Sequence, residues 1–358
     1  MSKLYDIIDK LEETQNLEKE EFINLLDNLT ESLAQYAYEK ARKVAREHFG
    51  NRIYIRGLIE ISNYCKNDCL YCGIRRSNTN ADRYRLNKED VFSCCHTGYN
   101  LGFRTFVLQG GEDPFYSDEF LIELISEIKK NYPDCAITLS LGEKSRDSYQ
   151  KLFDAGADRY LLRHETADEA HYSKLHPKEL TLESRKSCLQ SLHDIGYQTG
   201  TGFMVGSPWQ TNENLAQDIL FIKELSPEMV GLGPFIPHHD TPFAGEAQGA
   251  LDKTLFLLAL LRLMKPSLLL PSTTALGTIH PKGRELGILA GANVVMPNLS
   301  PVDVRKKYLL YDNKLSSDAE AAEGLNSLKK QMDAIGYEVV TDRGDYAPQL
   351  RKGVLLDV

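Results

Sequence analysis

The sequence predicts an α/β protein whose main domain is a (β/α)8 barrel of the TIM type, with an N-terminal helical extension and a short C-terminal tail. From about residue 52 onwards, short apolar runs alternate eight times with helical stretches, and buried parallel strands have this apolar character. Glycines stand where several helices should end; these are Gly102, Gly156, Gly196 and Gly291. Eight successive βα units predict a closed barrel, and a partial barrel of six units with additions is the alternative.

The strands are expected at residues 55–61, 104–109, 136–141, 159–164, 199–205, 229–235, 267–273 and 292–297. The helices are expected at about 88–101, 118–131, 144–155, 182–195, 211–225, 251–264, 282–290 and 316–335. Functional sites on such barrels lie at the C-terminal ends of the strands, so the candidate residues are sought there.

The first fifty residues read as helices that pack on the barrel. Apolar residues repeat at helical spacing between Leu4 and Leu11, and Thr30 can cap a helix that runs to about Glu47. We therefore divide the chain into a helical extension at 1–50, the barrel at 51–335 and a tail at 336–358.

The 358-residue chain has the composition of an ordinary globular protein, with 42% hydrophobic and 26% charged residues. Its formal net charge of −9 argues against nucleic acid or an anionic membrane as the main partner. The longest apolar stretch, Leu255 to Met264, is too short to span a bilayer, and the N-terminus lacks the apolar core of a signal peptide. Seven cysteines, three of them in one loop, do not suggest a secreted disulfide framework, so we expect a reducing cytoplasm.

The three clustered cysteines, Cys65, Cys69 and Cys72, follow the first predicted strand at spacing C-x3-C-x2-C. A loop can fold thiolates at this spacing around one metal centre, and iron–sulfur clusters are held by cysteines in such runs. A structural zinc site usually has four protein ligands, and the nearest histidines, His48 and His96, are distant in sequence. Three ligands on a four-iron cluster would leave one iron open to a substrate. A zinc knuckle is the alternative.

The second and third strands end in groups that suit a polar ligand. Gly110 and Gly111 allow a ligand to approach the backbone closely, and Glu112 supplies a hydrogen-bond acceptor. Thr138 and Ser140 share one face of the third strand, and their hydroxyls suit a carboxylate or a ribose. A tight turn without a ligand is the alternative interpretation of the two glycines.

Charged residues directly follow the fourth strand, where burial is costly unless they are paired. Arg163 and Glu165 share a face, so an ion pair between them is one interpretation. The other places Glu165 on ribose hydroxyls and Arg163 on a substrate carboxylate. Arg185 lies at the start of a predicted helix. Its guanidinium suits bidentate carboxylate binding, and a surface arginine is the alternative. A methionine such as Met204 is more often a core residue, and contact of its backbone with a ligand, which the glycines on either side would permit, is the alternative.

Two further groups have chemistry that is less specific. His238, His239 and Asp240 follow the sixth strand and suggest a metal site, although adjacent histidines rarely converge on one metal. A basic stretch after the cysteines is either a solvated surface or a lid over an anionic ligand. It consists of Arg75, Arg76, Arg83 and Arg85.

The cysteine spacing, with Tyr71 directly before the last cysteine, resembles the radical S-adenosylmethionine (SAM) superfamily. This resemblance implies a [4Fe–4S] cluster on the three cysteines, whose open iron binds the amino and carboxylate groups of SAM. One electron then cleaves the sulfonium to give a 5′-deoxyadenosyl radical. The stretch Gly110-Gly111-Glu112 resembles the GGE-type motif of the superfamily, which receives the amino group of the methionine part of SAM.

Several stretches in combination resemble the HydE family of FeFe-hydrogenase maturases over roughly residues 50–312. The resemblance implies a substrate that is a cysteine-bound Fe(CO)2CN complex made by the sister maturase HydG. It implies attack of the adenosyl radical on the cysteine sulfur, as a step towards the di-iron subsite of the H-cluster. It also implies an external electron donor, and HydF as an acceptor scaffold. The stretches are residues 159–166, 233–238, 240–242, 273–278 and 291–298.

By position, the resemblance assigns roles to individual residues. Those expected to contact SAM are Tyr71, Gly110, Gly111, Glu112, Ser140, Glu165, Arg185 and Met204. Those expected to contact the substrate are Thr138, Arg163, Thr273, Thr274, Met296 and Tyr308. Some members of the family carry three further C-terminal cysteines for an auxiliary cluster. This chain has no cysteine after residue 312, so a second cysteine-ligated cluster is not expected there.

Three alternatives remain open. A lysine mutase similar to methylornithine synthase should place an acidic residue or two deep in the cavity to hold an amino group, and the sequence shows hydroxyls and arginine instead. A HydE-like paralogue would act on another substrate. A carrier of an iron complex would keep the cysteines but would need no contacts to SAM, and Gly110 to Glu112, Glu165 and Arg185 argue against it.

Overall fold

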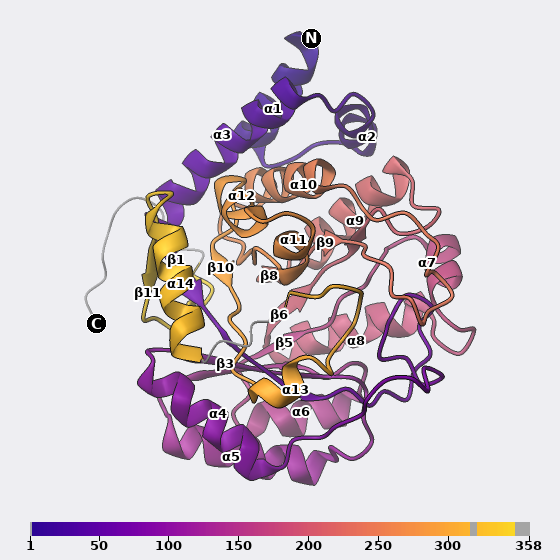
Figure 1. Ribbon diagram of the computed structural model, residues 1–358. Helices are drawn as coiled ribbons and strands as arrows, with labels where there is room; N and C mark the ends of the chain where they lie inside the picture. Colours follow the sequence, from indigo (N-terminus) through magenta and orange to yellow (C-terminus); the bar gives the residue numbers. More distant parts are fainter. Residues whose placement is uncertain (1, 316–320, 348–358) are drawn as a thin grey trace.

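The computed structural model describes residues 2–315 and 321–347, and its centre is a closed ring of parallel strands surrounded by helices (Figure 1). Six of the strands form one sheet. Single bridges from Met229 to Leu269 and from Pro271 to Val294 continue this sheet to β10 (Val294–Val295), which pairs with β1 (Arg52–Ile55). The predicted (β/α)8 barrel is therefore confirmed, and the six-unit alternative is wrong. The sheet runs β2 (Gly57–Ser62), β3 (Thr105–Gly110), β4 (Ala136–Ser140), β5 (Arg159–Leu161), β6 (Gln198–Thr201) and β8 (Met229–Val230).

Several strands are shorter than predicted. The predicted strand at 199–205 is divided into β6 and β7 (Met204–Val205), and β9 (Gly233–Pro234) pairs with β7. The predicted seventh strand at 267–273 forms only isolated bridges. Pro271 lies in its middle and has no N–H to donate to a neighbouring strand.

Helices cover the outside of the ring, and most begin at a side-chain cap that the sequence supplies. Three short helices were not predicted: α7 (Glu169–Leu175), α11 (Thr274–Ile279) and α13 (Val302–Arg305). The predicted outer helices are α4 (Lys88–Asn100), α5 (Asp118–Asn131), α6 (Arg146–Asp154), α8 (Leu182–Ile195), α9 (Asn212–Leu225), α10 (Leu251–Met264), α12 (Gly283–Leu289) and α14 (Ala321–Asp333). Residues 316–320, which we expected in the last of these, lie outside the described residues.

The N-terminal extension forms α1 (Ser2–Thr14), α2 (Lys19–Asp27) and α3 (Glu31–Phe49). In Figure 1, α1 and α3 lie beside α10, and α2 lies near α9, and the same pairs of helices are in contact. This explains why α10 is apolar on nearly all sides, because it is enclosed between the barrel and the extension. Thr30 caps α3 as predicted, with its hydroxyl accepting from the Leu33 N–H at 3.3 Å.

The segment after residue 336, which we expected to be irregular, contains the short strand β11 (Glu338–Val340). It pairs in parallel with β1, on the opposite edge from β10. The following loop is held by charge, since Asp345 lies 2.5 Å from the fully buried guanidinium of Arg159. Strand β11 could not be predicted from its three residues, because the strand that it pairs with lies almost 290 residues earlier in the chain. No helix in the described part of the chain is long and apolar enough to cross a membrane.

Candidate active site

A cavity of about 330 Å³ occupies the barrel interior where the strands end. Every residue that the sequence assigned to the cluster, SAM or substrate lines this cavity, with the exception of Thr138. Thr138 is buried in β4, and its Oγ1 has no hydrogen-bond partner among the described residues. The fold thus brings together groups from segments between Cys65 and Tyr308.

The cysteine loop is held in place by backbone hydrogen bonds to distant segments. The Lys66 N–H donates to the Glu112 carbonyl at 2.8 Å, Leu70 donates to the Leu175 carbonyl at 3.0 Å, and Gly73 donates to the Leu310 carbonyl at 2.8 Å. These contacts fix the loop from three sides, so the thiol groups are positioned before any ligand binds.

The three thiols fit an iron–sulfur cluster better than one zinc ion. Within the described chain, their sulfur atoms do not form a group whose members all lie within 4.8 Å of one another. Ligands of a single tetrahedral zinc, at Zn–S distances of about 2.3 Å, would lie closer together than that. Burial raises the pKa of each thiol, and that of Cys72 rises to about 12. A bound metal centre would stabilise the thiolates.

The glycine turn after β3 approaches the cysteine loop very closely. A Cβ on Gly111 would lie 2.1 Å from the carbonyl oxygen of Tyr64 and 2.8 Å from the Cβ of Cys65. Only glycine permits this approach. Gly110 is less constrained, because the nearest atom to a Cβ there would be 3.3 Å away.

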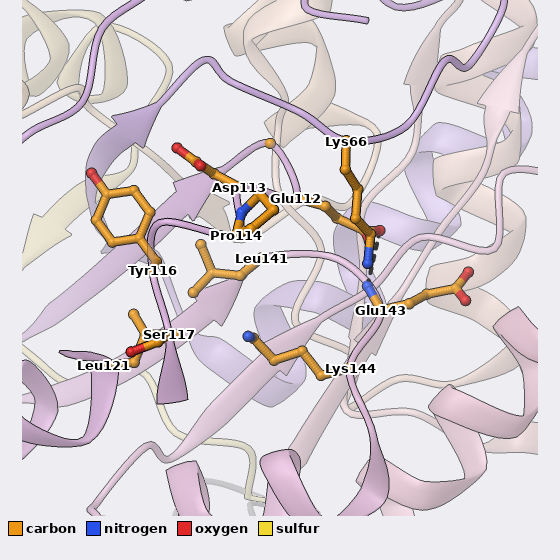
Figure 2. Close-up of a pocket in the computed structure, with 11 residues that line it drawn as sticks. Lys66, Glu112, Asp113, Pro114, Tyr116, Ser117, Leu121, Leu141, Glu143 and Lys144 are labelled. Carbon is orange, nitrogen blue, oxygen red and sulfur yellow. Dashed lines mark hydrogen bonds and ion pairs between the residues drawn. The ribbon is translucent and has the colours of Figure 1, made fainter. Parts of the chain in front are cut away.

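The carboxylate of Glu112 links the cysteine loop to the loop after β4. Figure 2 shows Lys66, Glu112 and Glu143 together at the edge of a second pocket of about 210 Å³, which adjoins the main cavity. Glu112 lies 3.1 Å from the Lys66 ammonium group and accepts a hydrogen bond of 3.0 Å from the Glu143 N–H. Gly142, at φ +77°, leaves the space that the Glu112 side chain occupies. Glu112 therefore joins two loops of the site.

Arg163 and Glu165 form the ion pair that their spacing predicts, with Nη2 and Oε2 separated by 3.0 Å. The angle does not make this contact a hydrogen bond, and the Nε and Nη2 of Arg163 have no hydrogen-bond partner among the described residues. Glu165 has a φ of +64°, which is rare for a residue with a side chain. Such strain is found at ligand sites that the surrounding structure holds in place.

Arg185 is anchored on both sides of its guanidinium. Its Nε donates to Glu143 at 2.6 Å, and its Nη1 donates to the carbonyl of Arg163 at 2.5 Å. Ser184 donates to the other carboxylate oxygen of Glu143 at 2.8 Å. The buried arginine is thereby presented to the cavity in one orientation.

Met204 and Tyr71 belong to a small apolar cluster beside the cysteines. The Met204 N–H donates to the Glu165 carbonyl at 3.3 Å, and the Met204 carbonyl accepts from Gln210 at 2.8 Å. A carbonyl oxygen has a second lone pair, so this group can still accept from a ligand. The Tyr71 ring meets His176 edge-on, with 5.4 Å between the ring centres.

The arginines after the cysteine loop have structural partners. Arg75 pairs with Asp68, Arg85 pairs with Asp113 at 2.7 Å, and Arg83 donates to several backbone carbonyls of the loop. These three therefore hold the loop, and the interpretation as a lid over an anionic ligand is wrong for them.

The two histidines after β9 do group with a carboxylate, but this carboxylate belongs to Asp312 and not to Asp240, which the sequence suggested. Ligand atoms of His238, His239 and Asp312 lie within 4.8 Å of one another. However, the Nδ1 of His238 accepts from the Asp240 N–H at 3.1 Å, so a neutral ring carries its proton on Nε2. That nitrogen is the one nearest Asp312 and cannot ligate a metal while it is protonated.

Sequence reasoning missed Glu60 and Lys314, which also line the cavity. Lys314 lies 2.5 Å from the fully buried carboxylate of Glu60. Glu60 is the one charged residue within an otherwise uncharged buried strand, and this irregularity was a signal that we did not use. Lys314 lies in a polar stretch, and nothing in the sequence indicates that this stretch returns to the barrel interior.

Comparison with known proteins identifies the type of barrel. Residues 59–222 match the model of the Radical SAM superfamily. The solved structure of methylornithine synthase, PylB, superposes with a TM-score of 0.83 at 27% identity over 93% of this chain and 97% of that one. HydG, a maturase of the [FeFe]-hydrogenase, superposes with a TM-score of 0.78 at 21% identity, covering 94% of this chain and 76% of that one, which shows a shared fold.

Two curated relatives match over nearly the whole chain. The 3-methylornithine synthase of Methanosarcina acetivorans is 29% identical over 92% of each chain. The [FeFe] hydrogenase maturase subunit HydE of Thermotoga maritima is 44% identical over 86% of this chain and 87% of that protein. Radical SAM proteins hold a [4Fe–4S] cluster and SAM, and the three thiols and the adjoining cavity fit both. The chain is therefore a radical SAM enzyme, and it belongs to the family of the maturase HydE.

Proposed function

We propose that this enzyme acts in assembly of the di-iron subsite of the FeFe-hydrogenase H-cluster, and that its substrate is a cysteine-bound Fe(CO)2CN complex supplied by HydG. The 44% identity to a HydE maturase supports the process. The observation that carries the substrate class is a set of unpaired donors in and beside the cavity. They are the Nε and Nη2 of Arg163 and the Oγ1 of Thr273, all buried and without hydrogen-bond partners among the described residues, although Nη2 lies 3.0 Å from the carboxylate of Glu165.

Unpaired buried donors are costly, and an anionic substrate would satisfy them. The proposed complex carries a carboxylate and a cyanide, which are both acceptors. Arg163 would hold the carboxylate through two N–H groups, and Thr273 and Thr274 would donate to the far end of the complex. Met296 and Tyr308 line the cavity beside them and would exclude water from the reacting sulfur.

When bound, the cluster and SAM supply a 5′-deoxyadenosyl radical after the transfer of one electron from an external donor, with methionine as the other product. The chain's own part is to orient the reactants. Cys65, Cys69 and Cys72 would hold the cluster. The turn from Gly110 to Glu112, together with Ser140, Glu165, Arg185, Tyr71 and Met204, would position SAM. In the proposed reaction the adenosyl carbon would form a bond to the cysteine sulfur of the substrate, and the iron of the complex would take up the unpaired electron, so that the iron is reduced by one electron.

A second candidate function, a mutase reaction on free lysine as in methylornithine synthase, is favoured by one observation. The expectation that no acidic residue lies deep in the cavity was wrong, because the cavity is lined by Glu60. However, both oxygens of Glu60 are engaged, one by Lys314 at 2.5 Å and the other by Asn298 at 2.8 Å. An incoming lysine ammonium group would have to displace Lys314, so we rank this function second.

The process is tested by maturation of a hydrogenase in an extract that contains HydF, HydG and the apo-hydrogenase but lacks HydE. We expect the reconstituted enzyme to restore hydrogen production and Cys72→Ala to restore none, since it lacks a cluster ligand. Failure of the wild type, in an extract that responds to the Thermotoga maritima maturase, would contradict the proposal.

The substrate site is tested by replacing Arg163 with Gln. Loss of a charged hydrogen bond worth about 1.5 to 3 kcal/mol should raise KM for the iron complex by about 10-fold to 100-fold. Cleavage of SAM in the absence of substrate should change little. Equal KM values for Arg163→Gln and the wild type would exclude Arg163 from substrate binding.

A further inference from the structure

A histidine and an aspartate form a buried contact between the loop after β5 and the outer helix α9. The side chains of His164 and Asp218 are both fully buried, and 3.4 Å separates the His164 Nε2 from the Asp218 Oδ1. Asp218 is the one charged residue among the buried residues of α9, a helix that the structure describes in full. A charged group is costly in such a place. None of the roles assigned above to the cluster, SAM or substrate uses either residue.

The histidine points away from the cavity and towards the layer of helices. Its neighbours Arg163 and Glu165 line the cavity, and successive side chains of an extended chain alternate between two sides. The His164 ring lies against that of Phe221 on α9, with 4.9 Å between the ring centres, and its Nδ1 lies 2.8 Å from the Thr201 hydroxyl. Burial lowers the pKa of His164, so the ring is neutral. A neutral imidazole has one donor and one acceptor, so one nitrogen can bond to Thr201 while the other faces α9.

The carboxyl group of Asp218 also holds the loop on the other side of Glu165. Its Oδ1 accepts a hydrogen bond of 2.5 Å from the Ala167 N–H. The angle of the contact with His164 does not make it a hydrogen bond, and the His164 Nε2 has no hydrogen-bond partner among the described residues. Such an atom is costly in the interior, and a small rotation of the carboxyl group would satisfy it. Asp218 thus contacts the residue before Glu165 and the second residue after it, and Glu165 lies between these contacts with a φ of +64°.

We propose that His164 and Asp218 are positioning residues, which hold Glu165 in its strained conformation so that its carboxylate meets the ribose of SAM. This inference rests on the role of Glu165 in SAM binding that is proposed above. A positive φ persists only where the surrounding structure enforces it. Without the carboxyl group of Asp218, the backbone at Glu165 would relax and its carboxylate would move away from SAM. The cysteine loop would keep its place, because other segments hold it.

The proposal is tested by calorimetric titration of SAM into the oxidised, reconstituted enzyme, in which SAM is not cleaved because no electron is available. Asp218→Ala should raise the Kd for SAM by about 10-fold or more, since misplacement of a binding group by about 1 Å has effects of at least this size. The iron content should equal that of the wild type. Asp218→Asn should restore most of the affinity, because it keeps an oxygen for the Ala167 N–H and a polar group for His164.

Ile219→Ala is the matched control for a general loss of stability. Ile219 is fully buried and adjoins Asp218 on the same helix, so its truncation should lower the free energy of unfolding and leave the Kd for SAM unchanged. His164→Phe keeps a ring against Phe221 but loses the polar contacts, and it should raise the Kd as Asp218→Ala does. It replaces Asp218→Ala should the latter not fold. An unchanged Kd in the folded variants of Asp218 and His164, or an equal rise in Ile219→Ala, would overturn the proposal.

Glu165→Gln separates this inference from the role proposed for Glu165 itself. If the carboxylate of Glu165 meets the ribose, this variant should also raise the Kd for SAM. A rise in Glu165→Gln with none in Asp218→Ala would refute the positioning role alone. No rise in either variant would refute the role of Glu165 as well.

Discussion

The close approach of the Gly111 turn to the cysteine loop makes Gly111→Ala the sharpest test of the site geometry. The new methyl group would lie 2.1 Å from the Tyr64 carbonyl oxygen, and an ordinary contact needs at least 3.4 Å, so one of the two segments must retreat by about 1.3 Å. Because Cys65 directly follows Tyr64, the retreat displaces a cluster ligand. A displacement of about 1 Å in an active site can lower the rate about 100-fold, or about 2.7 kcal/mol of transition-state stabilisation.

We therefore expect Gly111→Ala to lower the rate of 5′-deoxyadenosine formation about 100-fold. Overpacking should also lower the free energy of unfolding by about 1 to 3 kcal/mol. Gly245→Ala is the control, because a Cβ there would have no atom within 4 Å, and its rate should stay close to that of the wild type. The assay is anaerobic turnover with SAM and dithionite, with iron content measured for each variant. A wild-type rate and iron content in Gly111→Ala, or an equal loss in Gly245→Ala, would refute the reasoning.

Two other substitutions test the cluster and the base of the barrel. Cys72→Ala should abolish the absorbance and the EPR signal of the cluster, whereas Cys188→Ala, which removes a cysteine outside the loop, should retain both. Equal loss of these signals in the two variants would contradict the assignment of Cys72 as a cluster ligand. Burial favours the neutral form of Asp345, but Arg159 and other donors outweigh this and lower its pKa to about 2. Its contribution to stability is therefore complete above the unfolded-state pKa of about 3.9 and is lost as the pH falls towards about 2. Asp345→Asn should lower the free energy of unfolding by about 1 kcal/mol at neutral pH, allowing for solvent screening. Urea titrations should show that this difference between variant and wild type disappears between about pH 4 and pH 2. A difference that persists at pH 2 would contradict the ion pair.

The sequence predicted the barrel because each βα unit carries its own local signal. Periodic apolar residues and terminal glycines or caps are sufficient to place α5 or α8 within a few residues. The cysteine loop could be recognised because all three ligands lie within eight residues. The glycine turn and the pair Arg163–Glu165 followed from their positions at strand ends.

What the sequence could not predict depends on contacts between distant segments. Lys314 has no local feature that distinguishes it from a surface lysine, and only the fold brings it to Glu60. Strand β11 exists because β1 has a free edge at the base of the barrel. Arg83 looked like part of a surface for an anion because the sequence does not show that the folded loop turns its backbone carbonyls towards this side chain. The spacing of apolar and polar residues along the sequence does not indicate such contacts between distant segments.

The central claim is that this radical SAM enzyme acts on an anionic cysteine-bound iron complex. The most direct measurement is anaerobic turnover of the reconstituted enzyme with dithionite and SAM, in which 5′-deoxyadenosine and adenosyl adducts are quantified. Parallel reactions contain the cysteine-bound Fe(CO)2CN complex or lysine. The account predicts adenosyl adducts or stimulated turnover with the iron complex and no response to lysine. Stimulation by lysine alone would contradict the account and assign the enzyme to the mutase branch.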